Sequence, residues 1–136
     1  MSDWSRTWYV IGGLMLGVSS GVTYAAPSDS AEYISCIDRA GGVTADTINC
    51  IGQEIARQDP KLNQVYQQLI KAVTPTRQKQ LRDAQRLWLK YREANCRFYS
   101  DVDGGSLARI LANQCMLDML IERSAELEGL KQIEGL

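Results

Sequence analysis

Apolar residues recur at intervals of three and four along most of the chain after residue 44, the spacing that places side chains on one face of an α-helix. Proline, glycine and small polar residues divide this pattern into four stretches, and no stretch of useful length alternates as a β-strand does. The pattern therefore predicts an all-α fold, a small bundle of about four helices closed by short loops. The apolar positions are Ile48, Ile51, Ile55, Leu62, Val65, Tyr66, Leu69, Ile70, Val73, Leu81, Ala84, Leu87, Trp88, Tyr91, Ala94, Phe98, Leu107, Ile110, Leu111, Leu117, Leu120, Ile121 and Leu127.

Capping residues and prolines indicate where the first three helices begin. Thr44 can accept a hydrogen bond from the backbone amides that open a helix, which we expect to end near Gln58. Asp59-Pro60 is typical of a new start, with Asp59 as the cap and the proline at the first helical position. Thr74-Pro75 repeats this signal and opens the most regular helix of the chain.

The residue composition indicates where the helical region begins and where it ends. Residues 26–43 mix Pro, Ser, Asp and Gly with little periodicity, so we expect a loop-like N-terminal arm. Ser106 is expected to cap a last helix that ends near Gly129. The sequence thus predicts a helical domain over residues 44–130 and a C-terminal tail over residues 131–136.

Residues 1–25 have the form of a secretory signal peptide. Arg6 and the amino terminus give a weakly positive start, an apolar run of about fifteen residues follows from Trp8 to Val22, and small residues precede cleavage after Ala25. The run is shorter than the roughly 20 residues that a bilayer-spanning helix needs, although an uncleaved anchor is the alternative. We therefore expect a periplasmic or secreted protein with no stable membrane anchor after cleavage.

Four cysteines follow the expected cleavage site, and an even number in a short exported chain favours two disulfides over a metal site. The favoured pairing is Cys36–Cys50 with Cys96–Cys115, which closes loops of about 14 to 20 residues, each worth about 3 kcal/mol. The pairing Cys50–Cys96 with Cys36–Cys115 stays open, because residues equally far from the turn at Thr74 meet in an antiparallel hairpin.

Charge is nearly balanced overall but unevenly placed. Residues 77–97 hold seven basic and two acidic side chains, a net charge of +5, whereas residues 101–136 hold three basic and seven acidic ones, a net charge of −4. We expect these segments to pack antiparallel, with opposite charges facing each other. The neighbouring acids would cancel the field that a phosphate backbone needs, so no nucleic-acid partner is expected.

The chain contains no histidine, which excludes Ser-His and Cys-His catalysis and histidine-ligated zinc. No Ser-x-x-Lys spacing occurs after the expected cleavage site either. We therefore expect a binding protein rather than an enzyme, with no cofactor and no metal.

Several short motifs follow one another in the order seen in a known family. They are Cys36, Asn49-Cys50, the block Ala84-Gln85-Arg86-x-Trp88-x-x-Tyr91-Arg92-x-x-x-Cys96, Gly104-Gly105-Ser106, Cys115 and Arg123. From Cys36 to Leu127 the chain resembles the LprI-like lysozyme-inhibitor domain of bacterial envelope proteins. The resemblance implies a secreted or periplasmic helical domain, some of whose relatives bind and inhibit lysozyme. Two departures are the Asp59-Pro60 interruption and the lack of a threonine before Arg123.

The side chains of the family block divide by position on their helix. Trp88 and Tyr91 lie on the apolar stripe and are predicted to be core. Gln85 and Arg92 flank the stripe seven residues apart, where they can bond to carbonyls or carboxylates of a facing helix. All five residues of the block, Gln85, Arg86, Trp88, Tyr91 and Arg92, are expected to be mainly structural.

The turn before the last helix is the candidate partner-binding site. Adjacent glycines let the backbone turn sharply, and a tight loop anchored by cysteines can be preorganised to enter an enzyme cleft. The lysozyme cleft holds two carboxylates within strongly basic surroundings, so the loop's acids would meet the basic rim, and Ser106 or Arg109 would meet the carboxylates. The candidate residues are Asp101, Asp103, Gly104, Gly105, Ser106 and Arg109.

Two functions follow from these observations. The first is a protein that binds and inhibits lysozyme or a related cell-wall hydrolase. The alternative is a non-enzymatic structural or stress-related module of the envelope. An exposed apolar patch of Leu130, Ile133 and Leu136 with Ile121 or Leu117 would favour the alternative.

Overall fold

The computed structural model describes residues 29–101 and 103–135, which form four helices and, within these ranges, no strand. The all-α bundle predicted from the sequence is confirmed. The predicted signal peptide, residues 1–25, lies outside the described residues, and none of the described helices is long and apolar enough to cross a bilayer. The helices are α1 (Ala31–Ala40), α2 (Thr44–Ala72), α3 (Pro75–Phe98) and α4 (Gly105–Ile133).

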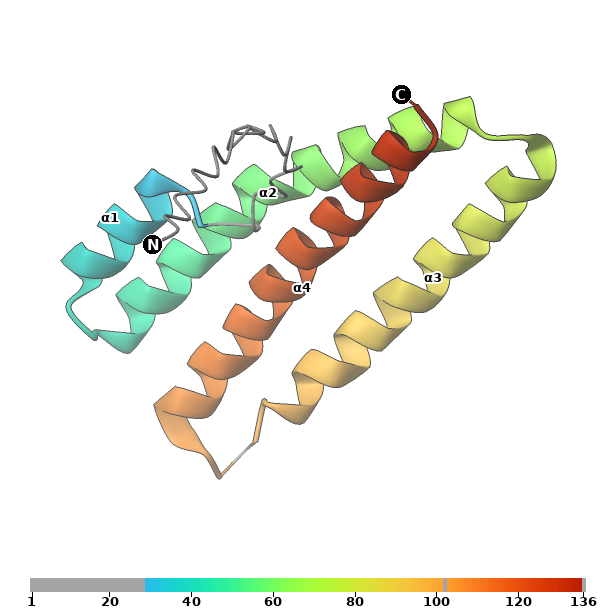
Figure 1. Cartoon of the computed structure of the whole chain (residues 1–136). Helices are drawn as coiled ribbons and strands as arrows, with labels where there is room; N and C mark the ends of the chain where they lie inside the picture. The colour runs from blue at the N-terminus through green and yellow to red at the C-terminus, as the bar shows by residue number, and fades with distance from the viewer. Residues whose placement is uncertain (1–28, 102, 136) are drawn as a thin grey trace, which may run out of the picture.

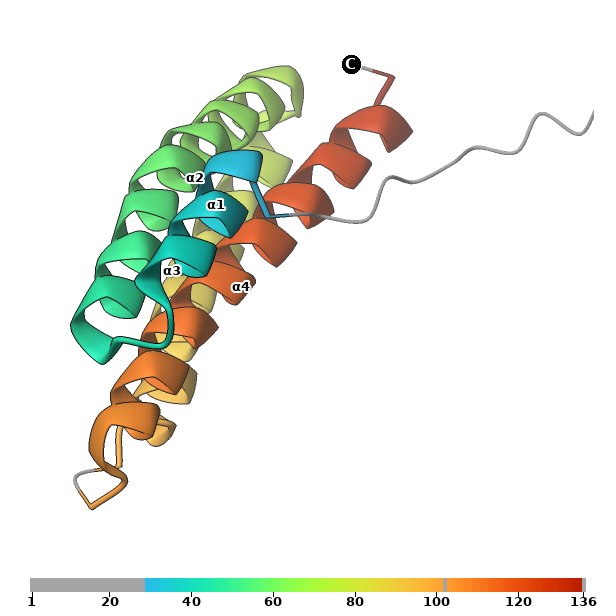
Figure 2. The same cartoon turned by 90° about the vertical axis from the view of Figure 1, so that its left-hand side faces the viewer.

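Helix α4 lies at the centre of the bundle. It packs mainly along α2 and less extensively against α3, while α1 packs on α2 (Figure 1). Helices α1 and α3 lie on opposite sides of α4, and α2 and α3 have few contacts with each other. In Figures 1 and 2 the turn between α3 and α4 extends past the turn between α1 and α2. The far end of the α3–α4 hairpin is therefore a projecting tip.

Two apolar clusters hold the helices together. The first joins α1, α2 and α4 around Ile51 and Leu117, both fully buried. The second joins α2 and α4, and α3 contributes Leu81 and Trp88 to its edge. Its buried members are Leu62, Leu69, Leu120 and Leu127.

The arm that we expected to be loop-like contains helix α1, so this expectation was wrong. Ser30 caps the helix, because its Oγ accepts the Tyr33 backbone N–H at 3.1 Å. Gly41 ends the helix in the left-handed conformation, with φ of 55°. Burial of Tyr33 and Ala40 against the bundle stabilises a helix that is too short to persist alone.

The expected break at Asp59-Pro60 is also absent, because α2 continues through both residues. Pro60 removes one backbone donor, but its ring is exposed and does not disturb the core. Asp59 does not act as a cap; its carboxylate accepts a hydrogen bond from the Asn63 side chain at 3.0 Å. The α2 cap was also misassigned, since Val43 precedes the helix without a side-chain hydrogen bond and Thr44 is its first residue.

Helix α3 begins as predicted, with Thr74 as the cap residue and Pro75 at the first helical position. Helix α4 differs from the prediction at both ends. It begins at Gly105 after a cap residue Gly104, so Ser106 lies inside the first turn and does not cap it. It also continues beyond Gly129 to Ile133, because Leu127 is fully buried and Leu130 packs against the second cluster.

Substitution Gly129→Ala is expected to raise the free energy of unfolding by about 0.5–1 kcal/mol. A Cβ atom at this position meets nothing within 4 Å, and alanine favours the helix. Urea unfolding followed by circular dichroism measures the change. Gly105→Ala is the contrasting variant, because Gly105 has φ of 64° and should lose about 1 kcal/mol. Equal stability of native protein and Gly129→Ala would contradict a helix that passes through this residue.

The favoured disulfide pairing is confirmed. Cys36–Cys50 fixes α1 to the start of α2, with 5.7 Å between the Cα atoms. Cys96–Cys115 joins α3 to α4 near the tip, with 5.4 Å between the Cα atoms. The alternative pairing of Cys50 with Cys96 is excluded by these bonds.

Opposite charges of α3 and α4 face each other, as expected, at one place. Arg77 of α3 pairs with Glu134 at the end of α4. The other ion pairs in the described part of the chain join residues three or four apart on a single helix. Most of the positive charge of α3 is therefore not neutralised by α4.

Candidate functional site

The tip of the α3–α4 hairpin, residues 98–111, gathers the residues of the predicted partner-binding loop. Helix α3 ends at Phe98 and α4 begins at Gly105. The disulfide Cys96–Cys115 closes the base of the tip, and Cys96 is buried. The covalent link restricts the separation of the two helices where the chain reverses.

Local bonds give the turn a defined shape. The Asp101 carboxylate accepts the backbone N–H of Asp103 at 3.0 Å, and the Asp101 carbonyl accepts the backbone N–H of Gly104 at 3.2 Å. A Cβ at Gly104 would lie 2.6 Å from the Cβ of buried Ala108, so glycine is required there by close approach. Gly105 is required by its positive φ.

Four large apolar side chains surround this turn and are exposed to solvent. Phe98 is 84% exposed and packs edge to face on Tyr99, with 5.9 Å between the ring centroids. Leu107 and Leu111 belong to the first turns of α4 and are 62% and 44% exposed. Phe98 is one of the apolar positions of the predicted helical pattern, but no neighbouring helix extends to cover it. Exposed aromatic and aliphatic side chains on one projecting tip are typical of a protein-binding surface.

Carboxylates lie beside these apolar side chains. Asp101 and Asp103 are exposed in the turn. A hollow of about 310 Å³ next to the tip is lined by Tyr99 and Leu111 and also by Asp118 and Glu122 of α4. The tip therefore presents apolar side chains within a negatively charged surround, and Arg109 and Ser106, both exposed, are its remaining polar residues from the predicted site.

The negative charge extends from the hollow toward the start of α1. Gln114 joins the two regions, accepting a hydrogen bond from Tyr33 Oη at 2.7 Å and donating one to Asp118 at 2.7 Å. Burial raises the pKa of Asp29, and the charges of Asp118 and Glu54 raise it further. Burial likewise raises the pKa of Tyr33, with a contribution from Asp29. The smaller contributions to these shifts come from Asp29, Glu54 and Asp118, carboxylates that lie on the same side of the bundle.

The family block on α3 divides into residues that pack and residues that do not. Gln85 bonds to the facing helix, although its partner is a guanidinium and not the expected carbonyl or carboxylate: its side-chain carbonyl accepts a hydrogen bond from Arg123 Nε at 3.1 Å. Trp88 is half-buried against the second cluster, and the Arg123 guanidinium lies 5.8 Å from its ring centroid. Tyr91 is 60% exposed, so its prediction as core is wrong.

Arg92 lacks the predicted bond to a carbonyl or carboxylate of the facing helix. Its guanidinium instead lies over the Trp88 ring, 4.8 Å from the centroid. Its Nε is buried and finds no acceptor within the described residues. The packing role of Arg92 is thus a cation–π contact rather than a hydrogen bond.

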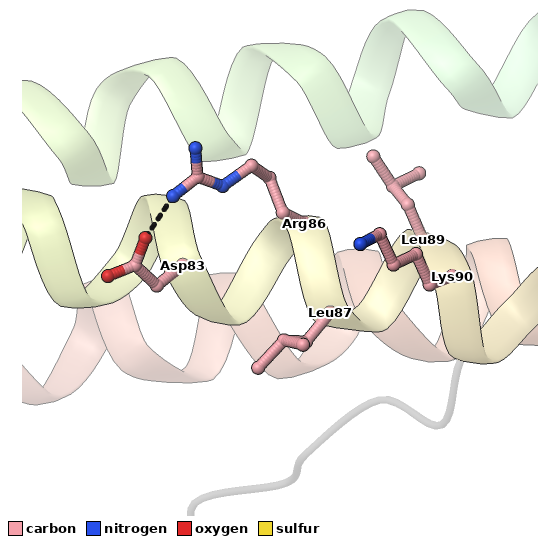
Figure 3. A pocket seen from close by; sticks show the side chains of 5 residues that line it. All are labelled: Asp83, Arg86, Leu87, Leu89 and Lys90. Carbon is pink, nitrogen blue, oxygen red and sulfur yellow. Dashed lines mark hydrogen bonds and ion pairs between the residues drawn. The ribbon is translucent and has the colours of Figure 1, made fainter.

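The outward face of α3 carries a second set of exposed groups, which Figure 3 shows from close by. Leu87 is 67% exposed and Leu89 is 44% exposed. Beside them Arg86 pairs with Asp83. All of these side chains come from a single helix, so they form a surface and not an enclosed site.

The apolar patch that would favour the alternative function is not formed by its described members. Leu117 is fully buried, and Leu130 packs against the second cluster. Ile133 is exposed, and Leu136 lies outside the described residues. Within residues 29–101 and 103–135, no three His, Cys, Asp or Glu side chains are placed to hold a metal ion.

Sequence reasoning found the turn but missed its apolar neighbours Tyr99, Leu107 and Leu111, and the two carboxylates of the hollow. Leu107 and Leu111 are apolar positions at helical spacing, and spacing does not show how far the adjacent helix reaches. The aromatic pair Phe98-Tyr99, two residues after Cys96, was an available signal in the sequence.

Comparisons with known proteins agree with this architecture. The sequence profile of the family described as lysozyme inhibitor LprI matches residues 36–127, which include both disulfides and the tip. An uncharacterised protein of Rhizobium meliloti (strain 1021) is 27% identical over 97 residues, which cover 61% of this chain and 70% of that protein. No solved structure matches the chain.

Proposed function

Since the chain belongs to the lysozyme inhibitor LprI family, we propose that it is an exported, non-enzymatic protein that inhibits lysozyme or a related cell-wall hydrolase by inserting its tip into the enzyme's cleft. The family and the disulfides are consistent with an extracytoplasmic protein. Periplasmic location or secretion is part of the proposal. Its partner is thus a protein encountered outside the cytoplasm.

The observation that carries the proposal is the combination of shape, bracing and exposed side chains at the tip. A projecting loop fits a concave active site better than a flat helix face does. The Cys96–Cys115 disulfide and the glycine-dependent turn fix its conformation before binding, which lowers the ordering cost of association. Phe98, 84% exposed, is the type of aromatic anchor that dominates binding energy at interfaces.

The charges of the tip also support its insertion into the enzyme's cleft. Asp101 and Asp103 are exposed and would meet the basic surroundings of a lysozyme cleft, which would accelerate association and set the orientation of the complex. Arg109 and Ser106 follow the turn and would lie toward the pair of carboxylates that such enzymes use for glycoside hydrolysis.

Titration of lysozyme with the oxidised chain tests the proposal. Loss of cell-wall hydrolysis is expected at molar excess. Asp103→Lys and Phe98→Ala should each weaken inhibition about tenfold, since the first adds charge repulsion and the second removes an anchor. Their circular dichroism should remain unchanged, because both side chains are exposed.

Asp38→Lys is the matched control for charge. Asp38 is exposed on α1, outside the tip, and the substitution changes the net charge by the same amount. This variant should inhibit as well as the native chain. Full hydrolase activity at excess protein would refute inhibition, and equal weakening by Asp38→Lys would refute the assignment to the tip.

A further inference from the structure

A groove of about 320 Å³ lies between α2 and α3, away from the tip. It exists because α3 leans on α4 and has few contacts with α2. Buried Leu62 belongs to its lining, so the groove reaches the apolar core. Its volume is at the lower end of the range for small-molecule sites, roughly 300–1,000 Å³.

Positive charge dominates the lining of this groove. Arg82, Arg86 and Arg92 project from α3 along it, and α2 contributes a single carboxylate, Asp59. That carboxylate already accepts a hydrogen bond from Asn63. The groove therefore holds more cationic donors than anionic acceptors.

The three arginines are incompletely paired within the protein. Arg82 and Arg92 form no ion pair with any described residue, and Arg92 Nε has no acceptor there either. Arg86 pairs with Asp83, which lies outside the groove lining (Figure 3). By contrast, Arg123 of α4 is bonded to both Gln85 and Glu126. Arg123 is thus paired within the protein, whereas Arg82 and Arg92 of the groove keep donors for a ligand.

Amide side chains add neutral donors and acceptors beside the arginines. Asn63 and Gln67 line the groove from α2, and Gln85 lines it from α3. Because the Gln85 carbonyl is taken by Arg123, its NH₂ group remains as a donor. Guanidinium groups bind planar carboxylates and phosphates with two parallel hydrogen bonds, and amides bind the polar groups next to them.

We propose that the α2–α3 groove binds a small organic oxyanion, a molecule with a carboxylate or phosphate group that Arg82 and Arg92 contact. Two of the three groove arginines, Arg86 and Arg92, belong to the family block, and the tip does not explain their presence. The groove and the tip involve different residues, so binding here does not depend on lysozyme inhibition.

The test is an NMR titration of the ¹⁵N-labelled, oxidised chain with three probes. N-acetylmuramic acid supplies a carboxylate, glucose 6-phosphate supplies a phosphate, and N-acetylglucosamine is the neutral control. At least one anionic probe should shift amide signals of residues on both sides of the groove at millimolar concentration. Comparing the two anions identifies which oxyanion the groove prefers.

Arg82→Gln should weaken that binding about fivefold or more, the effect of one lost charge-assisted hydrogen bond. Arg82 is exposed, so the fold is retained. Arg97→Gln is the matched control, because Arg97 lies on the same helix outside the groove and pairs with Glu93. It should change the affinity by less than about twofold. Three results would overturn the proposal: no shifts in the groove with either anion, equal binding of the neutral sugar, or equal weakening by Arg97→Gln.

Discussion

Replacing Cys96 and Cys115 by serine should lower the free energy of unfolding by about 3 kcal/mol and should weaken the proposed inhibition of lysozyme about tenfold. The disulfide closes a loop with a sequence separation of 19 residues, and loss of such a crosslink increases the entropy of the unfolded chain by an amount worth about 3 kcal/mol. The proposed inhibition should fall because the tip must then be ordered when it binds. Urea unfolding and inhibition titrations, at a temperature where the variant is folded, measure the two effects.

Replacing Cys36 and Cys50 by serine is the matched control. This disulfide closes a loop of similar size, with a separation of 14 residues, so the loss of stability should again be about 3 kcal/mol. It lies at α1 and not at the tip, so inhibition by the folded variant should be retained. Equal loss of inhibition in the two variants would show that bracing of the tip has no specific role.

Replacing Glu54 by glutamine should lower the free energy of unfolding by about 2–3 kcal/mol, because it removes a buried charge whose partners remain. Glu54 is fully buried in α2. Its carboxylate accepts hydrogen bonds from Ser30 Oγ at 2.7 Å, Arg57 Nε at 2.7 Å and Gln58 Nε2 at 2.5 Å. Ser30 is the cap of α1, so this carboxylate links α1 to the bundle independently of the Cys36–Cys50 disulfide.

The same contacts make stability depend on pH. Burial acts to raise the pKa of Glu54, but hydrogen bonds from Ser30, Gln58 and Arg57 outweigh it and hold the pKa below its ordinary value of 4.5. A lowered folded-state pKa contributes stability above the unfolded pKa, and that contribution is lost as the pH falls through the folded value. Native protein should therefore lose stability below about pH 4.5, more steeply than Glu54→Gln.

Glu32→Gln controls for the removal of a carboxylate from this region. Glu32 is exposed in the first turn of α1, so its substitution should change stability by no more than about 0.5 kcal/mol. Native-like stability of Glu54→Gln, or an unchanged pH profile, would contradict the proposed link between Glu54 and α1.

Periodicity in the sequence was sufficient to predict the helical fold and most of α3. Thr74-Pro75 combines a cap residue with a proline at the first helical position, and this local geometry does not depend on the rest of the chain. The disulfide pairing was favoured for a related reason, because short loops bring cysteines together without a particular tertiary arrangement.

The continuity of α2 could not be predicted from apolar spacing. The buried face of α2 passes from Ile51 through Glu54 and Gln58 to Leu62 without a change of phase across Pro60. Two of its members are polar, so a search for apolar residues finds a gap there. Glu54 accepts hydrogen bonds from Gln58 on the same helix and from Ser30, which lies 24 residues earlier in the chain.

The exposure of the apolar side chains at the tip could not be predicted either, and the reason is different. Phe98 and Leu107 have helical spacing that is typical of a core, but the helices that would cover them end or diverge before the tip. The turn residues Asp101 and Asp103 were recognised from composition, and the structure brings them beside these apolar side chains. Their role in binding remains a prediction.

Hydrogen–deuterium exchange of the oxidised native chain, measured with and without an excess of lysozyme, tests the central claim most directly. Backbone amides of residues 98–111 should exchange more slowly in the complex, while those of α1 and the first half of α2 should keep their rates. Protection confined to other helices, or no protection at any residue, would contradict recognition through the tip.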